Sequence, residues 1–308
     1  MSKTSFAVSI ILSMSIMFAT LPVEAAKKRS LQKKIPQPIQ TSLVVDGKSG
    51  KILHSRNAKS KIYPASLTKV MTIYLIFEAL DSGKLRLNQS FYVSKYATEA
   101  LPSKLYLKHK ERITVRDTIL ALTVKSANDA ARVAAENIAG SEAKFARLMT
   151  IRAKQLGMTN TNFTNASGWH DPKQYTTAVD MAKLTIAIKR DFPKYYSFFN
   201  KSSFNFKGKT IKGHNKVTET YPGAEGLKTG FHTPAGCNLI TTATRGNKSL
   251  VGVVTGQKTS LIRDKKMVKL LDAHFGVRHK SIKKVSKAKN LKISSSAVKS
   301  RQTAKKRR

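Results

Sequence analysis

The sequence predicts an α/β protein of the α+β kind, with an antiparallel sheet, flanking helices and an inserted, mainly helical lobe. Strand-like runs occur near both ends of the domain, at residues 42–45, 52–54, 227–231, 238–244 and 249–255. Between them, residues 85–192 have mainly helical patterning. Because strands from both ends must share one core, we expect a single sheet whose edge strand comes from the N-terminal side.

Local signals support the individual elements. A glycine-rich turn at residues 46–50 separates the first two runs and predicts a hairpin. Helix starts are indicated where Thr114 precedes Asp117 and Thr177 precedes Asp180. Further helices are predicted over residues 128–139, 141–156 and 261–275, and a second hairpin over residues 204–212.

Composition limits the classes of partner. The chain has 308 residues, a hydrophobic fraction of 41% and a formal net charge of +40. So large a positive charge predicts an acidic partner surface, such as nucleic acid, anionic lipid or an anionic wall polymer. The lone Cys237 excludes a disulfide within the chain and a cysteine-based metal cage. The seven histidines are scattered, so no metal and no cofactor are expected.

The chain divides into four predicted parts. Residues 1–26 resemble a signal peptide, with a short apolar run before a small-x-small cleavage pattern. An uncleaved N-terminal anchor is the alternative. Residues 27–40 are predicted to be a basic linker, 41–278 a folded domain and 279–308 a disordered basic tail. Export to the periplasm or cell envelope, peripheral on the membrane, argues against nucleic acid as the partner of the positive charge.

The stretch around Ser66 and Lys69 is the first chemical candidate. An apolar periodicity from Leu67 to Leu80 predicts a helix with one buried face, followed by Gly83. Residues three apart lie on the same side of a helical turn, which makes the pair a candidate nucleophile and base. The same spacing recurs at five other serines, at residues 30, 141, 281, 286 and 296. Spacing alone therefore proves little.

Two later motifs make this pair specific. Ser126-Ala127-Asn128 lies between two predicted helices, and Lys228-Thr229-Gly230 lies on a predicted strand. The order Ser-x-x-Lys, Ser-x-Asn, Lys-Thr-Gly on helix, loop and strand resembles the serine penicillin-recognising enzymes. It is most similar to the D-alanyl-D-alanine carboxypeptidases, the low-molecular-mass penicillin-binding proteins. The resemblance covers residues 41–277 and implies a β-lactamase/transpeptidase-like fold.

The resemblance also implies roles for particular residues. Ser66 would form the acyl-enzyme, Lys69 would be the base and Ser126 would relay a proton to the leaving amine. The substrate-binding residues would be Asn128, Lys228, Thr229, Gly230, Phe231 and Arg263. Within that set, the backbone N–H groups of Ser66 and Phe231 would form the oxyanion hole. Thr229 and Arg263 would bind the terminal carboxylate, although an arginine on an exposed helix can also be merely solvated.

A lysine base must be neutral, and free lysine titrates near 10.4. Two lysines offer a physical solution. At roughly 5 Å and an effective dielectric of about 20, Lys228 would disfavour the Lys69 cation by about 3 kcal/mol. That corresponds to about two pKa units, and partial burial would lower the pKa of Lys69 further.

The implied partners are peptidoglycan stem peptides, β-lactams bound covalently, and an anionic membrane or wall surface that contacts the basic tail.

Two departures from the family pattern are Ala127, where glycine is frequent, and His232, where many relatives have threonine. A deacylating Glu-x-x-Leu-Asn segment is absent, which argues against a class A β-lactamase. A D-alanyl endopeptidase that cuts cross-links and a non-catalytic cationic envelope protein remain the alternatives.

Overall fold

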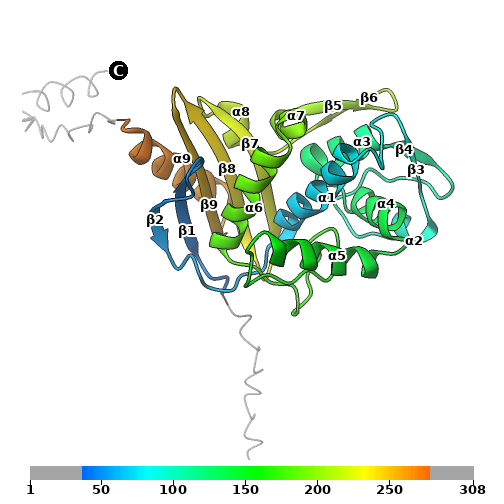
Figure 1. Ribbon diagram of the computed structural model, residues 1–308, viewed down its shortest axis with the longest axis horizontal. Coiled ribbons are helices and arrows are strands. Elements are labelled where there is room, and N and C mark those ends of the chain that lie inside the picture. Colours follow the sequence, from blue (N-terminus) through cyan, green and yellow to red (C-terminus); the bar gives the residue numbers. More distant parts are fainter. Residues whose placement is uncertain (1–36, 278–308) are drawn as a thin grey trace, which may run out of the picture. The chain divides into compact units, whose positions relative to one another are not determined.

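A computed structural model of the chain describes residues 37–277 (Figure 1). The predicted signal peptide, most of the predicted linker and the predicted basic tail lie outside the described residues. The described part therefore corresponds to the predicted catalytic domain, preceded by the last four residues of the linker.

The main sheet has five antiparallel strands in the order β2-β1-β9-β8-β7. Their bounds are β1 Thr41–Asp46, β2 Ile52–Arg56, β7 Ala224–His232, β8 Gly236–Arg245 and β9 Lys248–Gln257. The N-terminal hairpin joins the C-terminal strands through the β1–β9 pair, and β2 is one edge, as the sequence predicted (Figure 1). The other edge is β7, the strand that carries Lys-Thr-Gly.

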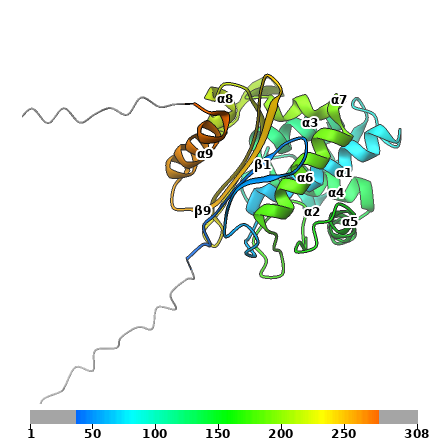
Figure 2. The same ribbon diagram turned by 60° about the vertical axis from the view of Figure 1, so that its left-hand side comes forward.

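Helices cover both faces of this sheet (Figure 2). Successive side chains in a strand point to opposite faces, so Leu239 and Val254 pack with α9 (Ser260–Phe275) on one side. Their neighbours Ile240 and Val253 belong to the larger core on the other side. There α6 (Ala178–Asp191) contacts β1, β8 and β9. The continuous apolar runs of β8 and β9 are thus explained by burial on both faces.

The helical lobe lies beside the sheet and is formed mainly by the middle of the chain (Figure 1). Its elements are α1 Lys69–Asp81, α2 Lys95–Thr98, α3 Val115–Leu120, a π-helical turn Ala121–Lys125, α4 Asn128–Ala139 and α5 Glu142–Gln155. Predicted N-caps are confirmed, since the hydroxyls of Thr114 and Thr177 accept from the N–H groups of Asp117 and Asp180 at 2.9 and 3.0 Å.

Several short elements carry too few residues for a periodic signal, and the sequence missed them. They are α2, the strand β4 Arg112–Thr114 that pairs with β3 Ser90–Tyr92, α7 Pro193–Tyr196, the 3-10 helix Ser197–Asn200 and α8 Lys216–Thr220. The predicted second hairpin is confirmed as β5 Ser203–Phe206 and β6 Lys209–Lys212, which form a separate two-stranded sheet. The helix whose start was predicted at Thr114 runs through α3 and continues as the π-helical turn.

Helix α1 is more deeply buried than the sequence predicted. One buried face was expected, yet every residue from Lys69 to Phe77 is buried. The physical reason is position, because α1 contacts α4, α5 and α6 and so lies between the lobe and the helix that covers the sheet. A helix enclosed in this way needs apolar side chains all round.

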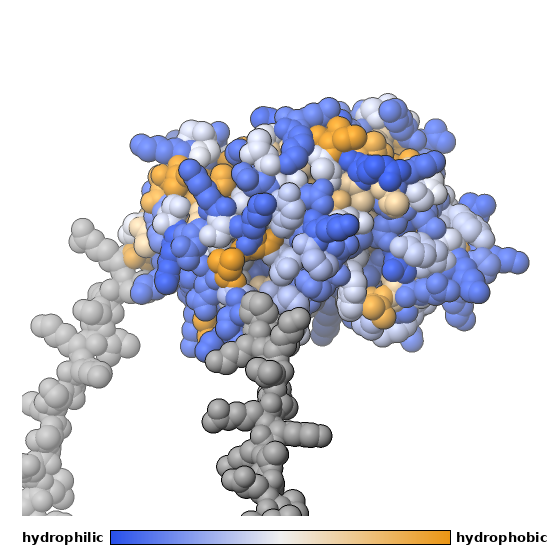
Figure 3. All heavy atoms as spheres, turned by 90° about the horizontal axis from the view of Figure 1, so that it is seen from below, coloured by the Kyte–Doolittle hydropathy of each residue, from blue (hydrophilic) through white to orange (hydrophobic). Residues whose placement is uncertain are grey.

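Within residues 37–277, no helix combines the length and the apolar character needed to cross a bilayer. The face shown in Figure 3 is mostly hydrophilic, with small separate hydrophobic areas. Lys and Arg outnumber Asp and Glu by more than two to one over residues 37–277 as well as in the whole chain.

Asn238 on β8 links the sheet to the segment that precedes Ser66. Its side chain is fully buried, its Nδ2 donates to the carbonyls of Tyr63 and Pro64, and its Oδ1 accepts from the N–H of Gly256 at 2.9 Å. One amide therefore satisfies three buried backbone groups, and it fixes where the turn at Pro64 meets the sheet.

Replacing Asn238 with alanine should leave the Tyr63 carbonyl and the Gly256 N–H without this partner, whereas the Pro64 carbonyl still accepts from the Leu67 N–H. We expect Asn238→Ala to lower the free energy of unfolding by about 2–4 kcal/mol, measured by urea denaturation. The control is Asn205→Ala on the exposed hairpin, where a change within about 0.5 kcal/mol is expected. Equal effects of the two substitutions would contradict this role for Asn238.

Candidate active site

A cleft at the junction of the lobe and the β7 edge collects the predicted site residues. Its walls include Ser66, Ser126, Asn128, Thr229, Gly230, Phe231 and Arg263. The two lysines, Lys69 and Lys228, lie behind this lining, with 0% and 2% of their surface exposed. Segments separated by more than 150 residues in the sequence thus meet in one place, as the three motifs predicted.

The backbone around Ser66 is closely packed. Ser66 lies in a 3-10 turn, Ala65–Thr68, directly before α1, and Ala65 has a φ of +48°. A Cβ on Gly168 would lie 1.9 Å from the Ala65 carbonyl oxygen, and one on Gly230 would lie 3.1 Å from the Ser66 nitrogen. Only glycine allows these two backbones to approach the nucleophile so closely.

The Lys69 amine makes three hydrogen bonds. Its Nζ lies 3.0 Å from Ser66 Oγ, 2.7 Å from Asn128 Oδ1 and 2.5 Å from the carbonyl oxygen of Ser167. The contact with Ser66 lies within the distance over which a proton can pass between a nucleophile and its base. The pairing that the sequence predicted from spacing is therefore present in three dimensions.

Burial is the main cause that lowers the pKa of Lys69 well below its ordinary value, and the Lys228 cation is the second. This order reverses the emphasis of the sequence argument, which gave Lys228 the larger share. The carboxylates of Asp129 and Glu142 act in the opposite direction. Burial, together with the nearby Arg263, also lowers the pKa of Lys228, to about 7.

Ser126 ends the π-helical turn with a φ of +61°, an uncommon backbone conformation for serine. Its side chain lines the cleft, and its buried Oγ has no hydrogen-bond partner in the part of the chain that the structure describes. A buried hydroxyl without a partner is costly, so its retention here suggests a functional use.

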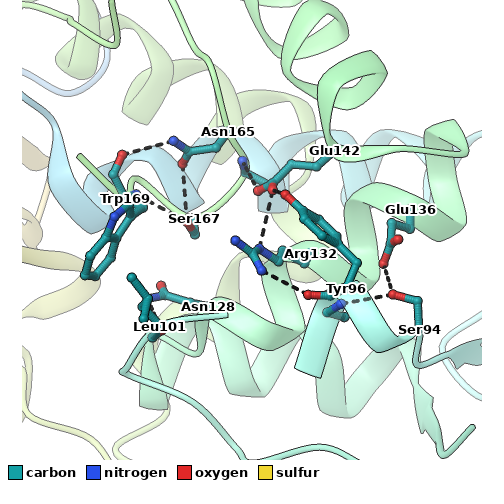
Figure 4. Close-up of polar contacts among 12 residues, drawn as sticks. Ser94, Tyr96, Leu101, Asn128, Arg132, Glu136, Glu142, Asn165, Ser167 and Trp169 are labelled. Carbon is teal, nitrogen blue, oxygen red and sulfur yellow. Dashed lines mark hydrogen bonds and ion pairs between the residues drawn. The ribbon is translucent and has the colours of Figure 1, made fainter. Parts of the chain in front are cut away.

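Asn128, the first residue of α4, is already engaged at both ends of its amide. Its Oδ1 accepts from Lys69, and its Nδ2 donates to the carbonyls of Leu101 and Pro102 at 2.8 and 3.1 Å. Figure 4 shows it beside Leu101. The predicted role in holding the substrate amide would therefore require Asn128 to give up or share one of these bonds.

Arg263 in the first turn of α9 is 4% exposed, so the alternative of a solvated surface arginine is wrong. Its Nε donates to Asp264 at 2.8 Å, while Nη1 reaches the Asn238 carbonyl at 3.5 Å. The side chain lines the cleft together with Thr229 and Phe231. A cation at this end suits a carboxylate ligand.

The cleft also contains residues to which sequence reasoning gave no role. Trp169, His214, Cys237 and Lys258 all line it. Trp169 and Cys237 lie within the range of the family resemblance, but neither belongs to one of the three motifs. His214 and Lys258 follow no pattern that would single them out in a lysine-rich chain. Their position became visible only in the folded chain.

His232 occupies the position where the family pattern is broken. Its ring lies 5.1 Å from that of His170, between centroids, and its Nδ1 accepts from the N–H of Ala235 at 3.1 Å. Burial, with a smaller contribution from His170, lowers the pKa of His232 to about 4. Across residues 37–277, no three His, Cys, Asp or Glu side chains form a group that could hold a metal ion.

A serine hydroxyl bonded to a buried lysine, at the junction of an antiparallel sheet and a helical lobe, is typical of serine hydrolases that use lysine as the base. The sequence profile described as D-alanyl-D-alanine carboxypeptidase, Peptidase S11, matches residues 29–259. The chain is 31% identical to the D-alanyl-D-alanine carboxypeptidase DacF of Bacillus subtilis over 86% of this chain and 69% of DacF.

Solved structures agree with this assignment. Penicillin binding protein 5 from Haemophilus influenzae has a TM-score of 0.74 and 34% identity, covering 78% of this chain and 71% of that one. Penicillin-Binding Protein D2 from Listeria monocytogenes, in its cefotaxime-bound form, has a TM-score of 0.70 and 30% identity, covering 76% of this chain and 96% of that one.

The chain therefore belongs to the Peptidase S11 family of D-alanyl-D-alanine carboxypeptidases and has the fold of the penicillin-binding proteins. It spans between 60 and 69% of the length of three curated carboxypeptidases that it matches. The expected fold class and the resemblance stated from the motifs are both confirmed.

The close approach at Gly168 gives a direct test of the cleft geometry. In Gly168→Ala the new Cβ must displace the Ala65 backbone, so we expect labelling of the protein by a fluorescent penicillin to slow at least about 10²-fold. Gly83→Ala is the matched control, because Gly83 has a similar φ of +73° with no atom within 4 Å of the added Cβ. Control labelling should match that of the unsubstituted protein, and equal labelling of both variants would refute the argument.

Proposed function

We propose that this chain is a serine-type D-Ala-D-Ala carboxypeptidase that removes the terminal D-alanine from peptidoglycan stem pentapeptides through an acyl-enzyme on Ser66. The observation that carries the proposal is the 3.0 Å contact between Ser66 Oγ and the fully buried amine of Lys69. Burial favours the neutral amine, and a neutral amine beside a hydroxyl can accept its proton near neutral pH.

In the first step, Ser66 Oγ attacks the carbonyl carbon of the penultimate D-alanine while its proton passes to Lys69 Nζ. The negative charge that forms on the carbonyl oxygen would be met by the backbone N–H groups of Ser66 and Phe231. This placement is supported by the position of β7 at the sheet edge, where it contacts the 3-10 turn of Ser66.

The C–N bond of the intermediate then breaks. The leaving amine of D-alanine takes its proton through Ser126, whose unpartnered hydroxyl suits a relay. Water hydrolyses the ester of Ser66 in the second half of the reaction, which releases the shortened peptide and restores the hydroxyl. Lys69 can serve as the base in both halves, since the first half ends with its proton on the leaving group.

The terminal carboxylate of the substrate would lie at the end of the cleft lined by Thr229 and Arg263. Lys228 adds positive charge directly behind Thr229, to whose carbonyl its Nζ donates at 3.0 Å. A β-lactam presents a carboxylate and a strained amide in a similar arrangement. We therefore propose that penicillins acylate Ser66, which is also supported by the cefotaxime-bound form of the Listeria relative.

Peptidoglycan digestion tests the proposed activity. We expect the purified protein to release free D-alanine from pentapeptide-containing peptidoglycan, whereas cleaved cross-linked dimers as the main product would instead identify an endopeptidase.

Ser66→Ala should abolish release and penicillin labelling together. Lys69→Arg should lower kcat by about 10²–10⁴-fold at every pH, because arginine remains protonated. Undiminished turnover in either variant would exclude this mechanism, whereas absence of D-alanine release by the unsubstituted protein would favour a non-catalytic envelope protein.

We also propose that residues 1–26 direct export, so that the enzyme acts in the periplasm or cell envelope. The basic tail from His279 would hold it at an anionic membrane or wall surface. Each Lys or Arg near an anionic lipid surface is worth up to about 1 kcal/mol, an attraction that added salt weakens.

Truncation before His279 tests the tail. At low ionic strength, the truncated protein should bind vesicles that contain phosphatidylglycerol much more weakly than the full chain. Binding of the full chain should fall as salt is added. D-alanine release from a short soluble peptide should not change. Equal retention of both forms on the vesicles would mean that the tail is not the anchor.

A further inference from the structure

A buried carboxylate lies behind the catalytic pair and outside the cleft lining. Glu142, the first residue of α5, is 7% exposed. Its Oε1 accepts from the backbone N–H of Ala166 at 3.0 Å, and its Oε2 accepts from the Tyr96 hydroxyl at 2.5 Å. Arg132 Nε lies 3.5 Å from Oε2 (Figure 4). The side chain thus connects α2, α4 and α5 to the segment that carries Ser167.

Ala166 is fixed on both sides of its Cα. Glu142 holds its N–H, and the Thr72 hydroxyl on α1 donates to its carbonyl oxygen at 2.7 Å. The next carbonyl along the chain, that of Ser167, accepts from Lys69 Nζ at 2.5 Å. The peptide group that contains this acceptor is held on its other side, where the Gly168 N–H donates to Asn165 Oδ1 at 2.8 Å. Glu142 thus anchors the segment one residue before the acceptor, and Asn165 anchors it one residue after.

The number of hydrogens on the amine gives this acceptor its importance. A neutral lysine amine has two N–H hydrogens and one lone pair. If Asn128 Oδ1 and the Ser167 carbonyl accept the two hydrogens, the lone pair is left to point at the third neighbour, Ser66 Oγ. If the Ser167 carbonyl moved, the amine could rotate and direct a hydrogen at Ser66 instead, which would prevent proton transfer.

We propose that Glu142 is a positioning residue for the Lys69 base, which acts by holding the Ala166–Ser167 backbone so that the amine lone pair faces Ser66. The inference rests on the proposed function, because it takes Lys69 as the base. Glu142 is not one of the cleft residues, so its effect belongs to the rate of acylation and not to substrate affinity.

The charge of Glu142 has a second, separable effect. The charged groups that act on Lys69 are Lys228 on β7, Asp129 on α4 and Glu142 on α5. Glu142 in turn contacts Arg132 and Tyr96. Burial and Lys228 lower the pKa of Lys69, whereas the two carboxylates raise it. Removal of the Glu142 charge should therefore lower the pKa of Lys69 further. The acidic limb of the rate profile, where Lys69 loses its proton, should then move to lower pH.

Two substitutions separate position from charge. Glu142→Gln keeps an oxygen acceptor for the Ala166 N–H, so kcat/KM on a short peptide ending in D-Ala-D-Ala should stay within a few-fold at its plateau while the acidic limb moves to lower pH. Glu142→Ala loses the acceptor as well, and its plateau kcat should fall about 10²-fold with little change in KM. The matched control is Glu136→Gln on α4, because Glu136 binds Ser94 beside the same α2 and has no bond to Ala166 (Figure 4).

Each outcome decides the proposal. A Glu142→Ala variant with the plateau and limb of the Glu136→Gln control would overturn it. If Glu142→Ala does not fold, Glu142→Met, which fills the same space without an oxygen acceptor for the Ala166 N–H, is measured in its place, and an unchanged plateau there overturns the proposal. The acylation rate with a fluorescent penicillin is measured in parallel across pH, since it reports Lys69 without requiring D-alanine release. Loss of release in the unsubstituted protein would reject the carboxypeptidase function, while the acylation profiles would still test Glu142.

Discussion

The interaction on which this structure depends is the hydrogen bond between a serine hydroxyl and a lysine amine that has no exposed surface. A lysine buried as a cation would be strongly destabilising, so its surroundings must either neutralise it or satisfy it. Here they do both. Burial and Lys228 favour the neutral form, while Ser66, Asn128 and the Ser167 carbonyl occupy all three positions around the nitrogen. Most other features of the site follow from keeping this amine dry and oriented.

The charges around the amine are balanced between opposing signs. Lys228 and Arg263 lie on the sheet side, with Arg263 acting mainly on Lys228, and Asp129 and Glu142 lie on the lobe side. A site with cations alone would hold the pKa of Lys69 very low, and the amine would then be a weak base. The carboxylates moderate this effect and also organise backbone. Asp129 accepts from the N–H groups of Leu105 and Leu107, and Glu142 accepts from that of Ala166. The same charged groups therefore set both the electrostatics and the shape of the cleft.

The architecture explains how such a site can be rigid and still open to substrate. Edge strand β7 supplies Lys228, Thr229 and Phe231 from a sheet that is buried on both faces. The lobe supplies Ser126 and Asn128 from the junction between a π-helical turn and α4. Neither unit contains a complete site. The two are joined at Ser66, where glycines on either side allow backbones to approach closely.

The sequence by itself determined the strands, the long helices and the three motifs, because these depend on local periodicity, capping and short-range spacing. It also placed Ser66 and Lys69 within reach of each other, since three residues make less than one helical turn. Tertiary structure alone decided that α1 is buried all round, that Arg263 is buried and not solvated, and that burial outweighs Lys228 in lowering the pKa of Lys69. It alone brought Glu142 behind the base. Burial and electrostatic environment are sums over neighbours from distant parts of the chain, and no local pattern contains them.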